Sequence, residues 1–147
     1  MDEKIIEIKS PDQIIKTFKD EFNPILSKFE IIRVLKGQKF NAENVKKAVH
    51  IYERNDIIWH PGVYVFYSKG NVYRLGQHFE NSRLRVLQHI RDNTRNNTHS
   101  IQDLESSDDA EVILFNVIDA KNYHWVAAVE LFLEKRLAPL IPALRQG

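Results

Sequence analysis

The spacing of hydrophobic residues along the chain predicts several helices. After "SPDQ", apolar residues three or four positions apart predict a helix over residues 11–28, because this spacing puts them on one helical face. Ser10 and Gln13 stand at the two positions of a capping box, and Pro11 fits the first turn. The same periodicity predicts further helices at about residues 41–54, 82–93 and 124–137.

Runs of β-branched and aromatic residues predict the strands. "GVYVFY" and "NVYRLG" flank "SKGN", which is the pattern of a tight hairpin. With a two-residue turn at Lys69–Gly70, Tyr64 and Tyr73 would face the same side of the sheet. A turn one residue longer would bring Arg74 to that side instead, and the sequence is compatible with both. "FEIIRVLKG" and "AEVILFNVI" also predict strands, so we expect a small mixed α/β domain with the order α-β-α-β-β-α-β-α.

Composition then narrows the classes of function. The chain has 147 residues, which is the size of one domain, and 43% of them are hydrophobic. No apolar stretch approaches the ~20 residues that cross a bilayer, and the first residues do not form a secretory signal. We therefore expect a soluble, cytoplasmic protein with no membrane partner. The absence of cysteine excludes disulfides, thiolate metal sites and a cysteine nucleophile.

Charge is spread unevenly along the chain. The net charge is only +1, but residues 69–100 carry six Lys and Arg against two Asp and Glu. This basic stretch fits either an anionic partner or a solvated surface. If the partner is a nucleic acid, we expect five residues of this stretch to bind it: Arg74, Arg83, Arg91, Arg95 and His99.

An ordered set of motifs resembles the GIY-YIG nuclease family. The set comprises "GVY" at residues 62–64, "YRLG" at residues 73–76, Arg85 with His89 four residues later, and Glu130 within the last predicted helix. The resemblance covers about residues 61–139, more than half of the chain. It implies a three-stranded, mostly antiparallel sheet flanked by helices. Residues 60–142 would then be the catalytic core and residues 1–59 a mainly helical extension of unknown role.

The resemblance also implies an activity and a cofactor. Members of the family hydrolyse the nucleic-acid backbone with one divalent cation, so we expect an endonuclease acting on DNA with Mg²⁺ or Mn²⁺. It implies catalytic roles for five residues, of which the last would also bind the metal: Tyr64, Tyr73, Arg85, His89 and Glu130. The second motif has one residue more than the family pattern, so either Tyr73 or Arg74 fills its tyrosine position.

The chemistry of these residue types agrees with that expectation. Arg85 offers planar, permanently charged donors to phosphate oxygens, and a single carboxylate such as Glu130 can bind a Mg²⁺ ion that keeps its waters. Tyr64, with an ordinary pKa of ~10, would need a nearby cation to act as a base, and His89 could take its proton. Taken singly, each residue also fits an ordinary sheet or surface position. The alternative function is a catalytically inactive domain of the same fold that binds nucleic acid or protein.

Overall fold

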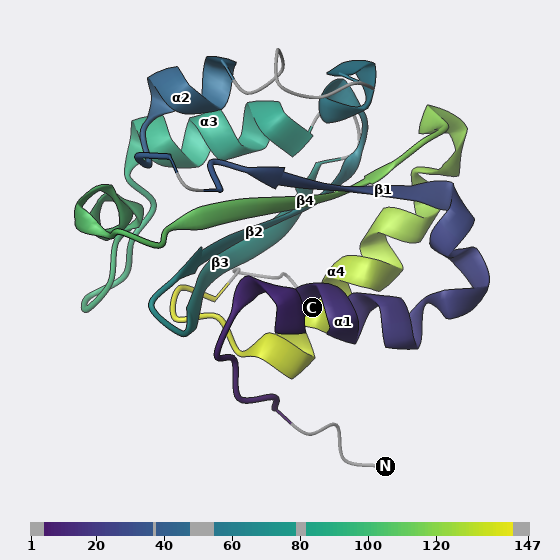
Figure 1. Ribbon diagram of the computed structural model, residues 1–147, viewed down its shortest axis with the longest axis horizontal. Helices are drawn as coiled ribbons and strands as arrows, with labels where there is room; N and C mark the ends of the chain where they lie inside the picture. The colour runs from purple at the N-terminus through teal and green to yellow at the C-terminus, as the bar shows by residue number, and fades with distance from the viewer. Residues whose placement is uncertain (1–4, 37, 48–54, 79–81, 143–147) are drawn as a thin grey trace.

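One antiparallel sheet of four strands, in the order β1-β4-β2-β3, runs through the middle of the molecule (Figure 1). The computed structural model describes residues 5–36, 38–47, 55–78 and 82–142. The strands are β1 (Phe29–Val34), β2 (Gly62–Ser68), β3 (Asn71–His78) and β4 (Glu111–Val117). The expected class of mixed helix and sheet is confirmed, but the expected three strands are wrong, because Phe29–Val34 of the N-terminal segment pairs with β4.

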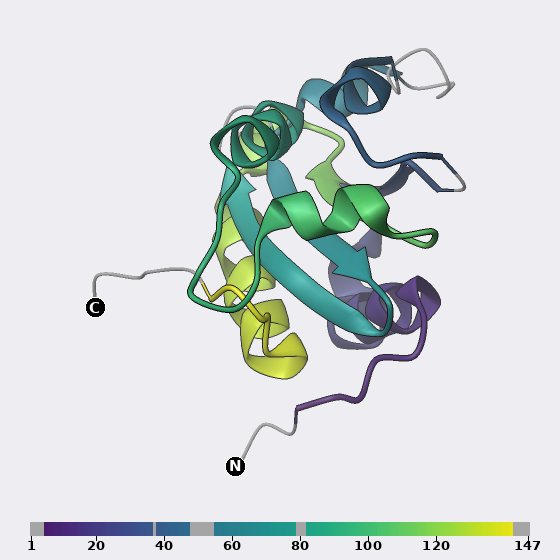
Figure 2. The same ribbon diagram turned by 90° about the vertical axis from the view of Figure 1, so that its left-hand side faces the viewer.

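Helices cover both faces of the sheet, as the two perpendicular views show (Figures 1 and 2). One face carries α1 (Pro11–Glu21) and α4 (His124–Leu137), and the other carries α2 (Ala42–Lys47) and α3 (Ser82–Asp92). Shorter 3-10 helices connect these elements: η1 (Asn23–Lys28), η3 (Asn55–Trp59), η4 (Ile101–Ser106) and η5 (Ala120–Asn122). No helix in the described part of the chain is long and apolar enough to span a membrane.

The first helix begins where the sequence predicts it and ends earlier. The side chain of Gln13 accepts a hydrogen bond from the backbone N–H of Ser10 at 3.3 Å, as in a capping box. The α-helix stops at Glu21, and residues 23–28 form η1 instead. Pro24 explains the early end, because proline disfavours helical geometry at the residue before it. The predicted second helix begins at Ala42 as expected, while residues 48–54 lie outside the described part.

The hairpin of β2 and β3 contains a two-residue turn and a bulge. Ser68 pairs with Asn71 around Lys69 and Gly70, which both have positive φ angles, of 49° and 78°. The predicted short turn is therefore present. Further along, the register shifts between Phe66 and Tyr67, so that one residue of β3 is left over.

The bulge decides which residue of β3 lies near Tyr64. Phe66 pairs with Arg74, and Tyr64 pairs with Gly76. The pairing of Phe66 with Tyr73, which a regular two-residue hairpin predicts, is wrong, because the extra residue is absorbed at Tyr73. The side chain of Arg74 is thereby placed on the same face of the sheet as Tyr64, although the turn itself has only two residues.

Candidate functional site

Tyr64 is the centre of the candidate site. Its ring points toward α3 and is only 2% exposed. Across the hairpin stands Gly76, where an added Cβ would lie 2.2 Å from the Tyr64 hydroxyl oxygen. A side chain at residue 76 would therefore push the phenol out of its place. The glycine that ends "YRLG" is needed because the ring of Tyr64 crosses directly over its backbone.

A chain of hydrogen bonds leads from Tyr64 into α3 and the loop after it. The Tyr64 hydroxyl is 2.7 Å from Nε2 of His89, and Nδ1 of His89 is hydrogen-bonded to Oγ1 of Thr94. His89 is 3% exposed, so it is not a surface histidine. Because a neutral imidazole has one N–H donor and one acceptor nitrogen, its ring can bridge the two hydroxyl groups in either tautomer. The three side chains form a relay along which a proton can move.

Charged groups around the relay fix its protonation. Burial raises the pKa of Tyr64 above its usual value, an effect that the guanidinium groups of Arg74 and Arg85 oppose and the carboxylate of Glu130 reinforces. Burial and the same two guanidinium groups lower the pKa of His89 to about 3. At neutral pH the site therefore contains a protonated phenol and a neutral imidazole. Its positive charge comes from the arginines.

Arg85 and Glu130 both act electrostatically on Tyr64, from helices that cover opposite faces of the sheet. Arg85 lies on α3, and its Nη1 donates to the side chain of Gln88 at 3.0 Å. Glu130 lies on α4 and is 4% exposed. Its charge still acts on Tyr64, so the two side chains are near enough for an electrostatic effect although α3 and α4 cover different faces (Figure 1). The site thus combines a phenol, two guanidinium groups, an imidazole and a carboxylate.

The described residues offer few ligands for the expected metal ion. Among the residues that the structure describes, no group of three or more His, Asp or Glu side chains is arranged to hold an ion. Glu130 is therefore the candidate ligand by itself. A hard cation such as Mg²⁺ prefers oxygen and can be held through one or two carboxylates while it keeps several waters. The residues present fit a largely hydrated cation and not a cage of protein ligands.

The other predicted residues lie away from the relay. Tyr73, in the bulge, packs its ring against His99 with centroids 5.8 Å apart, and burial together with the charge of Asp103 raises the pKa of Tyr73. Arg91 is exposed and pairs with its neighbour Asp92 at 3.0 Å.

Two further predicted residues belong to the surroundings of α3. Arg95 is exposed in the loop after the helix and donates to the backbone oxygen of Asn93. The backbone of Arg83 belongs to the first turn of α3, but its side chain lies outside the described part of the chain. Tyr64 and His89 thus belong to the relay, and the charges of Arg74, Arg85 and Glu130 act on its phenol, whereas Tyr73 contacts His99 instead.

Two residues of the site region, Thr94 and Asn116, belong to none of the motifs found in the sequence. Thr94 binds His89 from within the polar stretch "NTRNNTHS", where nothing distinguishes it from its neighbours. Asn116 is fully buried and donates to the backbone oxygen of Ile57 at 2.9 Å, which ties η3 to the sheet. A lone asparagine in the apolar run "VILFNVI" is a usable signal, because a buried amide needs hydrogen-bond partners. The position of Asn116 also explains why residue 62 is a glycine, because a Cβ there would lie 1.9 Å from the Asn116 side-chain oxygen.

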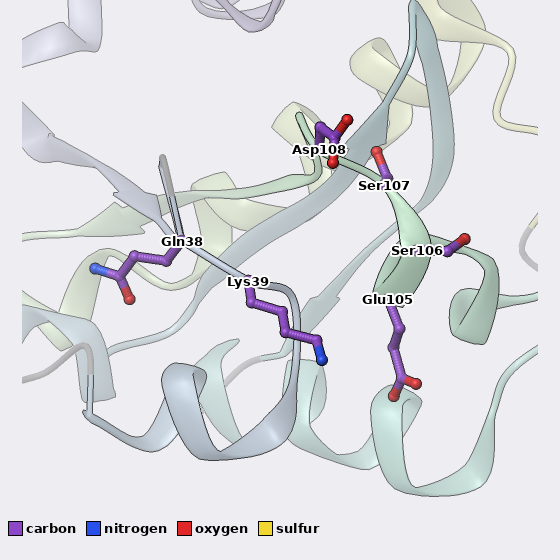
Figure 3. Close-up of a pocket in the computed structure, with 6 residues that line it drawn as sticks. All are labelled: Gln38, Lys39, Glu105, Ser106, Ser107 and Asp108. Atoms are coloured by element: carbon purple, nitrogen blue, oxygen red, sulfur yellow. The ribbon is translucent and has the colours of Figure 1, made fainter.

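A pocket elsewhere on the molecule is an alternative binding place. It has a volume of about 320 Å³ and lies between the segment after β1 and the residues that precede β4 (Figure 3). Lys39 stands on one wall, and Glu105 and Asp108 stand on the other. None of the residues predicted from the sequence lines it, and it contains no imidazole or phenol that could move a proton. We therefore take the surroundings of Tyr64 as the candidate site.

Comparisons with protein-family models, with curated proteins and with solved structures found no match to this chain.

Proposed function

We propose that the protein is a metal-dependent endonuclease that hydrolyses phosphodiester bonds of nucleic acid, with DNA as the first substrate to test. One observation carries the proposal. The hydroxyl of buried Tyr64 is hydrogen-bonded to a neutral His89, and the charges of Arg85 and Glu130 act on the same phenol. A fold needs none of these polar groups in its core, and burying them costs free energy unless they are paired.

Each group has a role in hydrolysing a phosphodiester. Arg85 binds a nonbridging phosphate oxygen and stabilises the charge that builds up on it. Tyr64 takes a proton from the attacking water and passes its own proton to Nε2 of His89. Thr94 holds the imidazole in orientation through Nδ1. Glu130 would hold Mg²⁺ or Mn²⁺, and the bound cation supplies positive charge at the phosphate oxygens.

Substrate binding would also raise the pKa of His89. The positive charges of Arg85 and Arg74 hold the pKa of His89 low in the free protein. A phosphate anion beside these guanidinium groups offsets their field, which makes a proton on the imidazole less unfavourable. His89 thus becomes a better proton acceptor when substrate is present.

Nicking of supercoiled plasmid DNA in Mg²⁺ or Mn²⁺ tests the proposal. We expect Arg85→Ala and Glu130→Gln each to lower the nicking rate by about 10²-fold or more, because each removes charge that acts on the transition state. Glu134→Gln makes the same change one helical turn away on α4 and should keep the activity. Absence of nicking by the unaltered protein, or equal nicking by all variants, would refute the endonuclease proposal.

A second candidate is a domain of this kind that binds nucleic acid without cutting it. This candidate is favoured by the small number of possible metal ligands. Among the described residues, Glu130 is the one buried carboxylate near Tyr64. Salt-dependent DNA binding, with no cleavage in any of several divalent cations, would support this candidate. The plasmid assay and a binding titration on the same preparation separate the two functions.

A further inference from the structure

The segment that follows α4 is attached to the outer edge of β3. We call residues 138–142 the C-terminal strap. Its backbone N–H groups at Leu140 and Ile141 donate to the backbone oxygens of Val72 and Tyr73, at 2.9 and 2.8 Å. From the other side, the Nδ2 group of Asn96 donates to the backbone oxygen of Leu140 at 2.7 Å. The strap is therefore fixed from two directions.

The strap also holds a side chain of the candidate site. Nη1 of Arg74 donates to the backbone oxygens of Ile141 and Pro142, at 3.3 and 2.8 Å. These acceptors are neutral, and no carboxylate lies within salt-bridge distance of Arg74 among the described residues. Its Nε atom is buried and has no hydrogen-bond partner there. A guanidinium with five donors is thus held in place while some of its donors stay unused.

We propose that Arg74 is a phosphate-binding residue of this site and that the C-terminal strap positions it. The inference rests on the proposed function, whose substrate is a phosphodiester. A buried donor without a partner is costly, and a phosphate oxygen is the acceptor that a guanidinium matches best. The strap carbonyls bind Nη1, whereas Nη2 donates to no described residue and is not buried, so Nη2 is the donor that an oxyanion can reach first.

The position of Arg74 in the sheet supports this role. The bulge places it opposite Phe66, two pairs along the ladder from Tyr64 and Gly76 and therefore on the same face as the relay. Its charge also acts on both Tyr64 and His89. A phosphate bound by Arg74 would therefore lie beside the phenol. Because Tyr73 is left over at the bulge, Arg74 takes the position opposite Phe66 that a regular two-residue hairpin would give to Tyr73.

Binding without cleavage tests this inference separately from the enzymatic proposal. A fluorescent DNA duplex is titrated with protein in EDTA, so that no metal is present, and the dissociation constant is measured over a range of salt concentrations. We expect Arg74→Gln to weaken binding by about ten-fold, since a charge-assisted hydrogen bond is lost. The slope of log K against log salt should fall by about one, because one phosphate contact disappears. Arg74→Lys should keep the slope and lose part of the affinity.

A matched pair of variants tests the strap. Asn96→Asp keeps the side-chain oxygen that accepts from the backbone N–H groups of Thr98 and His99, and it removes only the donor to Leu140. Asn97→Asp adds the same charge at the next, exposed residue. We expect Asn96→Asp to weaken DNA binding about three-fold more than Asn97→Asp does, by about the loss of one neutral hydrogen bond.

Three results would overturn the inference. Binding and salt slope unchanged in a folded Arg74→Gln variant would make Arg74 a structural clamp only. Equal effects of Asn96→Asp and Asn97→Asp would remove the strap from the site. No DNA binding by the unaltered protein would overturn both parts. If DNA binds in this way but plasmid is never nicked, the Arg74 site stands and the endonuclease proposal fails.

Discussion

At the scale of single residues, the relay depends on keeping His89 uncharged. The imidazole is buried, and the guanidinium groups of Arg85 and Arg74 oppose a further positive charge, so the pKa of His89 is lowered to about 3. Asp92 pulls the pKa in the other direction without reversing the shift. His89 is therefore a neutral bridge between Tyr64 and Thr94 over the physiological pH range.

This shift predicts how stability depends on pH. The unfolded chain takes up a proton on His89 near pH 6.5, whereas the folded chain does so only near pH 3. Between these values the unfolded state binds the extra proton, so His89 makes the protein less stable as the pH falls, by up to about 1.4 kcal/mol per pH unit.

Urea unfolding at a series of pH values between about 3.5 and 7 measures this dependence of the unfolding free energy on pH. His89→Gln should flatten this part of the stability curve, because glutamine cannot take up the proton. His124→Gln, at an exposed position on α4, should leave the curve as it is. Equal pH dependence in both variants would contradict a buried neutral imidazole.

The hydroxyl of Tyr64 can be tested without changing the ring. Tyr64→Phe removes the proton donor and should lower nicking by about 10²-fold. It also leaves a buried nitrogen of His89 without its partner, which we expect to cost about 1–3 kcal/mol of unfolding free energy. Tyr67→Phe is the matched control, because Tyr67 lies on the same strand, is equally buried and is hydrogen-bonded away from the relay. A variant Tyr64→Phe that nicks as fast as Tyr67→Phe would refute the catalytic role.

At the scale of elements, the hairpin of β2 and β3 brings the site together. Its two-residue turn sets the first pairs, and the bulge at Tyr73 then advances β3 by one residue. This shift in register pairs Gly76 with Tyr64 and places Arg74 on the same face of the sheet as Tyr64. A regular hairpin would instead put Leu75 opposite Tyr64, where its side chain would occupy the space of the phenol.

The close approach at Gly76 predicts a specific double-mutant result. Gly76→Ala should displace the ring of Tyr64 and break its hydrogen bond to His89, because the new Cβ would lie 2.2 Å from the hydroxyl oxygen. We expect a stability loss of about 1–3 kcal/mol and nicking as low as in Tyr64→Phe. The double variant should nick no more slowly than either single one, since both remove the same contact. Additive losses in the nicking assay would show that Gly76 acts elsewhere.

At the scale of the whole molecule, the N-terminal segment is joined to the sheet and is not a separate appendage. β1 pairs with β4 along its full length, and Arg33 of β1 forms two hydrogen bonds, at 2.6 and 3.0 Å, with the carboxylate of Glu111 on β4. On the face away from the relay, Phe18 of α1 packs against Phe115 with ring centroids 4.6 Å apart. These contacts complete the core beneath α1 and α4.

Loss of this packing should affect folding and leave the site chemistry intact. Phe18→Ala removes a fully buried ring and should lower the unfolding free energy by about 3–5 kcal/mol. Phe22→Ala, at a half-buried ring directly after the same helix, should cost less. Below the unfolding transition both variants should nick plasmid at the unaltered rate, because neither ring touches the relay. Loss of nicking by folded Phe18→Ala would show that the N-terminal segment contributes to the site directly.

The sequence by itself determined the elements, because their signals are local. Helical periodicity, the Ser10 cap and the glycine of the turn depend on residues a few positions apart, and the bounds of α4 and of the hairpin follow the prediction closely. The ordered motifs likewise predict a site at Tyr64, Arg85, His89 and Glu130 from the sequence alone, and the activity of this site stays a prediction.

Only the tertiary structure decided how these elements meet. The pairing of β1 with β4 joins segments about 80 residues apart, and no local pattern specifies it. The bulge that selects Arg74 over Tyr73 depends on the fit of Tyr64 over Gly76, which is a contact between strands. The hydrogen bonds from Thr94 to His89 and from Arg74 to the C-terminal strap depend on how the segments after α3 and α4 are placed in the fold. Periodicity fixes which face of an element is apolar, but the neighbour of each polar group is set by contacts between residues distant in sequence.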